Sequence, residues 1–394
     1  MQVFFRYLSI QISILSVFLL HSSALAQTSS SASAAEDESL RTGIKQAVLP
    51  IVGFNSNFGL SVGGLLQRFD YGDGDTAPFE NMTKYRFIFS TKNRFILKFD
   101  WEIIDNFGPD TRSLFIFEGL RFNEGSFFGI GNETPFSRSR FDQNLFFYQV
   151  RKTLVQYTGR KKLASLSNNG FIDGFLIGQV SFSKPKILEE ESEFSLTRPL
   201  GFNGGWVNWL GFGFIADSRN NEFNPTKGIF ARAQASLSDS FFQSDFNFGL
   251  YSFDFRKFTQ LYPDIVLAQR IKLDHTTGSP PFWERPSLGS EEELRGFVDD
   301  RFFGDTSIAH TTEIRTWLIE SKIFGETIRL GAQGFWDTGR VFSENDSNRF
   351  FKEWKHSYGG GIVYSLFTPD FIGRIDLGIS GEISRLYFSA GYAF

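Results

Sequence analysis

The sequence lacks cysteine and has little histidine or methionine: 394 residues include no Cys, 4 His and 2 Met. The absence of cysteine agrees with export through an oxidising compartment, where a free thiol is a liability. The formal net charge is −4, so no basic excess points to nucleic acid as a partner. Beyond the first segment there is no run of about eighteen apolar residues, which argues against a transmembrane helix.

Signals of catalysis are also absent. The histidines are His21, His275, His310 and His356, and no Gly-x-Ser-x-Gly elbow or metal-ligand spacing accompanies them. We therefore expect no enzyme, no metal site and no cofactor. The alternative is an outer-membrane lipase, which needs a serine beside one of these histidines in the fold.

The first 46 residues differ from the rest of the chain. Residues 1–26 carry one positive charge, an apolar run and Ala24-Leu25-Ala26 before Gln27, which predicts a signal peptide, with a short membrane anchor as the alternative. Residues 27–46 are rich in Ser and Ala and then acidic, so we expect a flexible linker. The folded domain is expected to span residues 47–394.

What the sequence has in abundance is phenylalanine and glycine, 50 and 38 residues, at a mean hydropathy of −0.17. Apolar and polar residues alternate, as in residues 94–103, where Phe95, Leu97 and Phe99 oppose Lys98 and Asp100. Many such segments have about ten residues, the length of a tilted strand crossing a bilayer. The alternative is a soluble all-β protein, because alternation alone does not say which face meets solvent.

We count about sixteen such segments, an even number as in single-chain bacterial barrels. Twelve or fourteen strands remain alternatives. The expected fold is therefore an all-β transmembrane antiparallel barrel. The approximate strand centres are Ile51, Gly64, Phe87, Phe99, Phe117, Phe147, Gly178, Gly211, Ala233, Leu250, Gln269, Glu313, Ala332, Ile362, Leu377 and Phe388.

A long loop separates the eleventh and twelfth segments, at residues 282–304. A loop of this length inside a β-protein is usually functional or disordered. It contains Leu294-Arg295-Gly296-Phe297, an arginine between apolar neighbours, which suits a folded tongue. Arg295 would need carboxylate partners once removed from water, and Gly296 permits a tight backbone turn.

This stretch resembles the Val/Leu-Arg-Gly-Tyr/Phe loop of the BamA- and TamA-like outer-membrane barrel superfamily, the bacterial surface antigen family. Gly289 matches the first glycine of that pattern, whereas Ser290 replaces the second. Asp217-Ser218-Arg219 with residues 223–228 resembles a second family motif at a periplasmic turn, where Asn, Pro and Gly form turns readily. The resemblance implies an extracellular loop folded into the lumen.

Partners for the arginine lie downstream. Phe335-Trp336-Asp337-Thr338-Gly339 resembles the family's Phe-x-Asp-x-Gly strand motif, and strand parity directs Phe335, Asp337 and Glu313 into the lumen. We predict that Arg295 bridges Glu313 and Asp337, with Phe335 and Gly339 anchoring the loop. The alternative is that all three charges are ordinary hydrated lumen residues.

The last residues alternate aromatics and end in Phe394, which resembles the β-signal of outer-membrane proteins. Parity predicts a lipid-facing row that includes Phe388, Tyr392 and Phe394; the alternative is an interfacial aromatic girdle. Pro50 in the first strand cannot donate a ladder hydrogen bond. We therefore expect a weak seam between the first and last strands, although proline at a strand edge is also common.

The resemblance implies a location in the bacterial outer membrane, with its lipids as partners. It also implies help in inserting or transporting proteins or lipids through the seam. The family's periplasmic POTRA modules have no counterpart in residues 27–46, which are too few for an independent core. A separate periplasmic or membrane protein is therefore an expected partner. The alternative is a passive outer-membrane pore or structural barrel.

Overall fold

The structure, a computed structural model, describes residues 42–55, 59–74, 78–91, 94–166, 170–323, 326–343, 352–365 and 370–394. Sixteen long strands make up most of the described chain. They are β1 (Ile44–Asn55), β2 (Gly59–Asp70), β3 (Asn81–Ser90), β4 (Phe95–Ile104), β5 (Thr111–Ser126), β6 (Phe147–Ser165), β7 (Phe171–Ser183), β9 (Gly205–Asp217), β10 (Gly228–Ser238), β11 (Phe248–Tyr262), β12 (Ile265–Gly278), β15 (Thr306–Ile323), β16 (Glu326–Phe342), β17 (Lys355–Ser365), β18 (Ile372–Ser380) and β19 (Ser384–Ala390).

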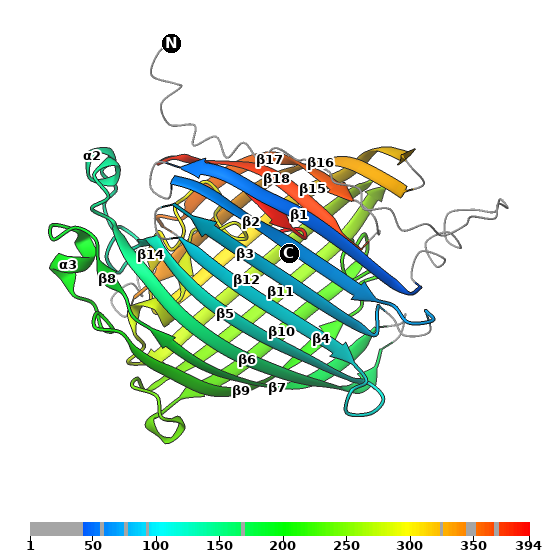
Figure 1. Cartoon of the computed structure of the whole chain (residues 1–394), viewed down its shortest axis with the longest axis horizontal. Coiled ribbons are helices and arrows are strands. Elements are labelled where there is room, and N and C mark those ends of the chain that lie inside the picture. The colour runs from blue at the N-terminus through cyan, green and yellow to red at the C-terminus, as the bar shows by residue number, and fades with distance from the viewer. Residues whose placement is uncertain are drawn as a thin grey trace, which may run out of the picture.

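Each long strand pairs antiparallel with the next long strand, from β1 with β2 through to β18 with β19. The strands tilt and wrap into a barrel (Figure 1). Within the described ranges no backbone ladder joins β1 to β19. Side chains from both ends of the sheet do pack together, since Leu49 of β1 and Ala390 of β19 contact one cluster of Ala47, Leu65 and Phe371.

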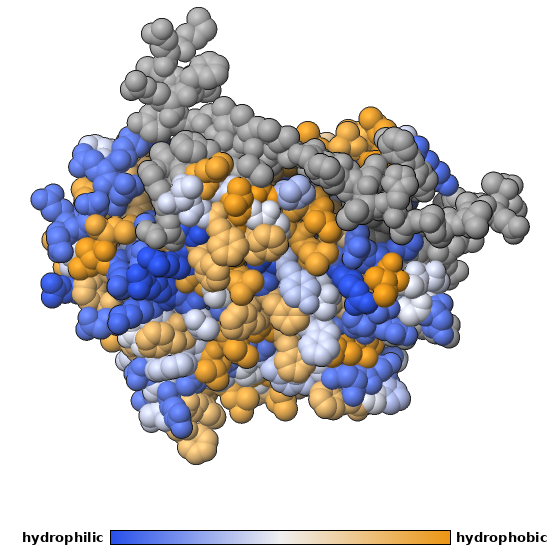
Figure 2. Space-filling model, in the orientation of Figure 1, coloured by the Kyte–Doolittle hydropathy of each residue, from blue (hydrophilic) through white to orange (hydrophobic). Residues whose placement is uncertain are grey.

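The alternating sequence separates two faces. On β4, Phe95, Leu97 and Trp101 are exposed on the outside. Figure 2 shows an apolar zone over the middle of the visible strands with polar zones toward both ends, the arrangement of a barrel surface that meets lipid. Aromatic and β-branched residues suit such a pleated surface. No described helix is long and apolar enough to cross a bilayer.

The two ends of the barrel differ. One end carries long connections that hold the short helices α2 (Arg138–Asp142) and α3 (Glu193–Thr197) and the two-residue strand β8 (Lys186–Ile187). A buried aromatic cluster lies there, formed by Phe127, Tyr148, Phe194, Phe282 and Phe303. The other end carries shorter turns, such as residues 263–264 between β11 and β12. We call these the long-loop end and the turn end.

The expected strand number is confirmed, and the loop at 282–304 does connect the eleventh and twelfth long strands, β12 and β15. Two boundaries are corrected. The first strand begins at Ile44, inside the expected linker, because its pairing with β2 continues to Asp70. Phe147 begins β6 and is not its centre, since the preceding aromatics pack into the long-loop end. The predicted signal peptide and linker residues 27–41 lie outside the described residues.

Candidate functional site

The segment between β12 and β15 folds inward as a tongue. It contains the 3-10 turn η2 (Phe282–Glu284) and the paired short strands β13 (Ser287–Leu288) and β14 (Phe302–Phe303). Its apolar side chains share a buried cluster with wall residues Ala309 and Val341; the tongue members are Leu288, Leu294, Phe297 and Phe302. The predicted folded tongue is thus confirmed, with hydrophobic burial holding it against β15 and β16.

Arg295 lies at the centre of the tongue and is fully buried, as are Glu313 on β15 and Asp337 on β16. Its Nε and Nη2 donate to the two carboxylate oxygens of Asp337 at 2.9 Å each. Nη1 lies 2.6 Å from Oε1 of Glu313. The backbone N–H of Arg295 donates to Asp337 at 3.0 Å. The predicted bridge is therefore confirmed, and its bidentate geometry is the strong form of such a pair.

Phe335 lies beneath the guanidinium, with Cζ 3.4 Å from the ring centroid. A desolvated guanidinium gains about 2 kcal/mol or more from such a cation–π contact. Burial by itself would lower the pKa of Arg295, but Glu313, Asp337 and Asp376 outweigh it and raise that pKa. The guanidinium therefore stays charged.

Sequence reasoning missed half of the charges in this network. Arg315 on β15 donates to the second oxygen of Glu313 at 2.8 Å. On β18, Arg374 donates to Asp376 at 2.5 Å, and Asp376 lies 3.6 Å from Nη1 of Arg295. The buried network thus contains three arginines and three carboxylates. Neutrality inside the low-dielectric interior offsets the desolvation of each charge. Lumen parity on β15 and β18 is the sequence signal that could have found them.

Gly296 brings the tip of the tongue against the backbone of β18. Its φ is +96°, and a Cβ there would lie 2.7 Å from the backbone nitrogen of Ile379. A Cβ on Gly378 would in turn lie 2.6 Å from the nitrogen of Gly296. The hydroxyl of Tyr387 on β19 accepts from the Gly296 N–H at 2.9 Å. Two facing glycines therefore allow the tip to reach the last strands.

Leu294 and Gly339 fit together on the other side of the tip. A Cβ on Gly339 would lie 2.4 Å from Cδ1 of Leu294, so only glycine leaves room for the leucine. Leu294 has a φ of +52°, a conformation that is costly for a residue with a Cβ. Gly339 thus lies against the tongue, where its role as an anchoring partner stays a prediction.

The expectation for the final residues is corrected in part. Phe388 is 36% exposed on β19, on the predicted outer face. The strand ends at Ala390, Gly391 has a φ of +92°, and the chain then turns inward. Phe394 is buried with Phe258, Ala268 and Ala393. The ring of Tyr392 lies under the guanidinium of Arg315, with its centroid 3.9 Å from Cζ. Cation–π contact and burial inside the barrel outweigh continuation of the lipid-facing row.

Arg315 joins the final residues to the tongue. Besides Glu313, it donates to the backbone oxygen of Phe394 at 3.1 Å. Because Glu313 also contacts Arg295, the tongue, β15 and residues 392–394 share one connected set of polar contacts. A displacement of either segment therefore changes the partners available to the other.

Pro50 lies in β1 opposite Gly64 of β2 and is exposed. Its missing N–H removes one possible ladder bond from β1. Whether Pro50 weakens a seam that opens stays a prediction, although its strand is one of the two between which no ladder is described.

The fold and the buried arginine site define a class of protein, confirmed by comparison with known families. The sequence model of the Omp85 superfamily domain matches residues 178–394, more than half of the chain. The chain therefore belongs to the Omp85 superfamily.

Among solved structures, the chain is similar to BamA from Haemophilus ducreyi lacking POTRA domains 1–3, with 14% identity, a TM-score of 0.53, and coverage of 88% of this chain and 70% of that one. CdiB from Escherichia coli gives 11% identity, a TM-score of 0.56, and coverage of 88% and 60%. CdiB from Acinetobacter baumannii gives 12% identity, a TM-score of 0.51, and coverage of 88% and 59%. The comparison with curated proteins gave no match.

Proposed function

We propose that the chain is an outer-membrane barrel that aids the insertion or transport of proteins or lipids through a lateral seam between β1 and β19. The observation that carries this proposal is the contrast between the lumen and the seam. The lumen contains a tongue held by buried ion pairs, whereas the described contacts between the two end strands involve side chains alone.

Family membership supports the same reading, because superfamily relatives with this barrel include BamA and CdiB. The bacterial outer membrane is the proposed location, with its lipids in contact with the apolar outer face. We further propose a periplasmic or membrane protein partner that presents substrate to the barrel.

The alternative, a passive pore or structural barrel, differs in conductance. A barrel that acts through its seam should show little steady conductance in a planar bilayer, since Arg295 holds the tongue inside. Deleting residues 287–305 should raise the conductance above that of the intact barrel. A large steady conductance of the intact barrel would instead indicate a passive pore and would contradict the proposed action through the seam.

A further inference from the structure

The turn between β9 and β10, residues 218–227, folds into the barrel and crosses it. This segment lies at the turn end, because Gly228 pairs with Phe258 while Gly278, which precedes the tongue, pairs with Phe248 at the other end of β11. Its contacts are with residues on and beside β2 to β5. Seven ladders separate β2 from β10 along the sheet. The contacts therefore bridge the lumen.

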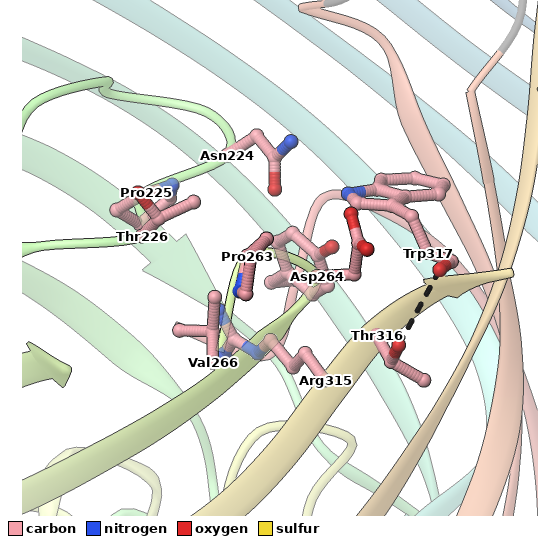
Figure 3. Close-up of a pocket in the computed structure, with 10 residues that line it drawn as sticks. Asn224, Pro225, Thr226, Pro263, Asp264, Val266, Arg315, Thr316 and Trp317 are labelled. Atoms are coloured by element: carbon pink, nitrogen blue, oxygen red, sulfur yellow. Dashed lines mark hydrogen bonds between the residues drawn. The ribbon is translucent and has the colours of Figure 1, made fainter. Parts of the chain in front are cut away.

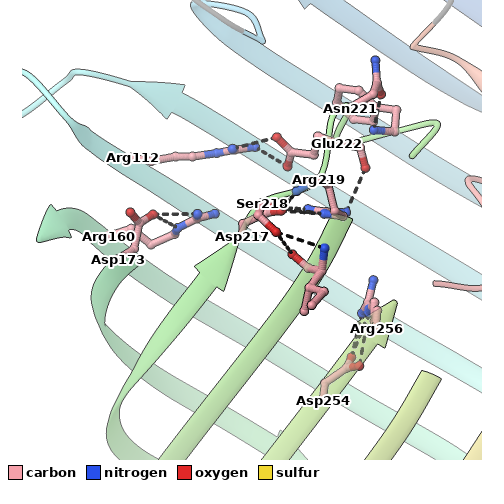
Figure 4. Close-up of polar contacts among 12 residues, drawn as sticks. Arg112, Arg160, Asp173, Asp217, Ser218, Arg219, Asn221, Glu222, Asp254 and Arg256 are labelled. Atoms are coloured by element: carbon pink, nitrogen blue, oxygen red, sulfur yellow. Dashed lines mark hydrogen bonds and ion pairs between the residues drawn. The ribbon is translucent and has the colours of Figure 1, made fainter. Parts of the chain in front are cut away.

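The first bridge is ionic. Glu222 of the turn accepts from both terminal nitrogens of Arg112 on β5, at 3.0 and 2.9 Å. The Nε of Arg112 donates to Glu102 on β4. Figure 4 shows this paired contact reaching from the strand to the turn. The contact with Glu102 thus positions Arg112 to bind Glu222 in a bidentate geometry.

The second bridge is aromatic. Phe223 packs edge-on against Phe69 at the end of β2, with centroids 5.7 Å apart, and lies 6.3 Å from Phe79. Phe69, Tyr71 and Phe79 form one buried cluster with Phe223 against it. An edge-to-face contact of this kind adds to the burial of the ring.

The turn is also shaped by its own hydrogen bonds. Arg219 holds Asp217 with both Nε and Nη2, at 3.0 and 2.6 Å, and its guanidinium lies 4.7 Å from the ring of Phe230. The side chain of Asn221 accepts from the N–H groups of Phe223 and Asn224, at 2.8 Å each. The segment thus presents Glu222 and Phe223 from a preformed scaffold.

Two cavities of different size lie beside the turn. On one side, Pro225 and Thr226 line a cavity of about 30 Å³ with Val266 of β12 and Arg315 of β15 (Figure 3), room for about one or two water molecules. On the other side, Phe223 lines a cavity of about 250 Å³ that also contacts Met82 and Ala390.

We propose that residues 218–227 form a latch that closes the lumen at the turn end, independently of the tongue. Arg112 and the Phe69 cluster hold the latch across the barrel. Full opening of the lumen then requires release of both the tongue and the latch, and release of the tongue alone opens it only in part. Release of the latch removes Phe223 from the lining of the larger cavity and widens access to it from the turn end.

Thiol labelling tests this directly, since the chain has no native cysteine. Met82→Cys places one thiol in the cavity behind Phe223. In proteoliposomes, a membrane-impermeant maleimide should label it slowly when the turn is unchanged. Glu222→Gln with Phe223→Ala should speed labelling by about tenfold or more, because labelling follows the open population of the turn. The single change Glu222→Gln should give a smaller increase and serves if the double variant does not fold.

Two controls separate latch release from general loosening. Lys227→Ala alters an exposed residue of the same turn and should leave the labelling of Met82→Cys unchanged. Phe107→Cys, at a position 72% exposed in the turn before β5, should label at one rate in every background. Two outcomes would contradict the proposed latch. One is fast labelling of Met82→Cys when the turn is unchanged; the other is an equal labelling rate with and without Glu222→Gln in folded barrels.

A second measurement uses conductance after deletion of residues 287–305. With the latch intact, that deletion should open the lumen only in part. Adding Glu222→Gln and Phe223→Ala should raise the conductance further. These readouts do not depend on insertion activity, so the latch and the proposed function can fail separately.

Discussion

At the scale of single residues, Arg295 is a buried charge that needs ionic partners inside the barrel. It is fully buried and matched by Glu313 and Asp337. Burying a charge without its partner is far more costly than burying the pair. Arg295 therefore compensates the buried charge of Asp337 and shares Glu313 with Arg315.

Arg295→Ala should destabilise the folded barrel by about 3–5 kcal/mol, because Asp337 loses its bidentate partner. The measurement is the fraction of heat-modifiable folded barrel as denaturant is increased. Arg329→Ala is the matched control, since Arg329 pairs with a 57% exposed Glu320 and should cost about 0–1 kcal/mol. Equal stability of the two variants would show that the buried bridge contributes nothing.

Gly296→Ala should lift the tip of the tongue from β18. The substitution adds a Cβ 2.7 Å from the Ile379 nitrogen at a φ of +96°, so both contact and conformation oppose it. Proteolysis within residues 287–305 should become faster. Gly381→Ala, with no atom within 4 Å of its added Cβ, should leave proteolysis unchanged, and a similar effect from both would disprove the close approach.

At the scale of elements, β15 couples two segments that are far apart in sequence. It carries Glu313, which contacts the tongue, and Arg315, which contacts Phe394 and Glu313. The strand therefore forms part of the barrel wall and also carries two side chains of the buried ion-pair network. Its lumen face connects the tongue with the residues after β19.

Arg295 and Arg315 should be energetically coupled through Glu313. We expect a double-mutant cycle of Arg295→Met and Arg315→Met to give an interaction energy of about 0.5–3 kcal/mol, the range found for residues in one ion-pair network. Equilibrium unfolding of the four proteins measures it. A control cycle of Arg295→Met and Arg160→Met should give additive effects, because Arg160 contacts Asp173 on another wall. Additivity in both cycles would show that Glu313 transmits no coupling.

The latch should respond to acid but not to alkali. Burial raises the pKa of Glu222, but Arg112, with Arg219 and Arg160, outweighs burial and holds the pKa below its usual 4.5. The contact with Arg112 is therefore fully formed above pH 4.5 and is lost as the pH falls through the lowered pKa. Labelling of Met82→Cys, corrected for maleimide reactivity, should stay constant above about pH 5 and rise below 4.5. With Glu222→Gln this rise should disappear; its persistence would assign the acid response to another group.

At the scale of the whole molecule, fifteen consecutive ladders connect β1 with β19, while the two end strands meet through side chains in the described ranges. Backbone pairing gives a barrel wall most of its resistance to opening, because unpaired groups in lipid are costly. The seam is thus the place where lateral opening breaks the fewest described contacts.

Locking the seam should abolish the proposed activity without unfolding the barrel. Leu49→Cys and Ala390→Cys, joined by a short bismaleimide, connect two residues that pack on one cluster. The locked barrel should no longer accelerate insertion of an unfolded barrel protein into liposomes. The control is Phe214→Cys with Ala233→Cys, at ladder partners on β9 and β10. Joining these two cysteines should leave the insertion activity unchanged. Full activity of the seam-locked barrel would contradict lateral opening.

Sequence by itself determined the two-faced strands, because period-two alternation fixes which residues face lipid; it predicted about sixteen of them, and the ladders of the structure decided between that number and twelve or fourteen. It also predicted the tongue, from the motif at residues 294–297 in a long loop, and two of its acidic partners, since parity directs Glu313 and Asp337 into the lumen. Only the tertiary structure decided that Arg315, Arg374 and Asp376 complete the network, that Phe394 turns inward, and that Glu222 reaches Arg112. These contacts join residues far apart in sequence across a closed interior, where no local pattern sets the partner.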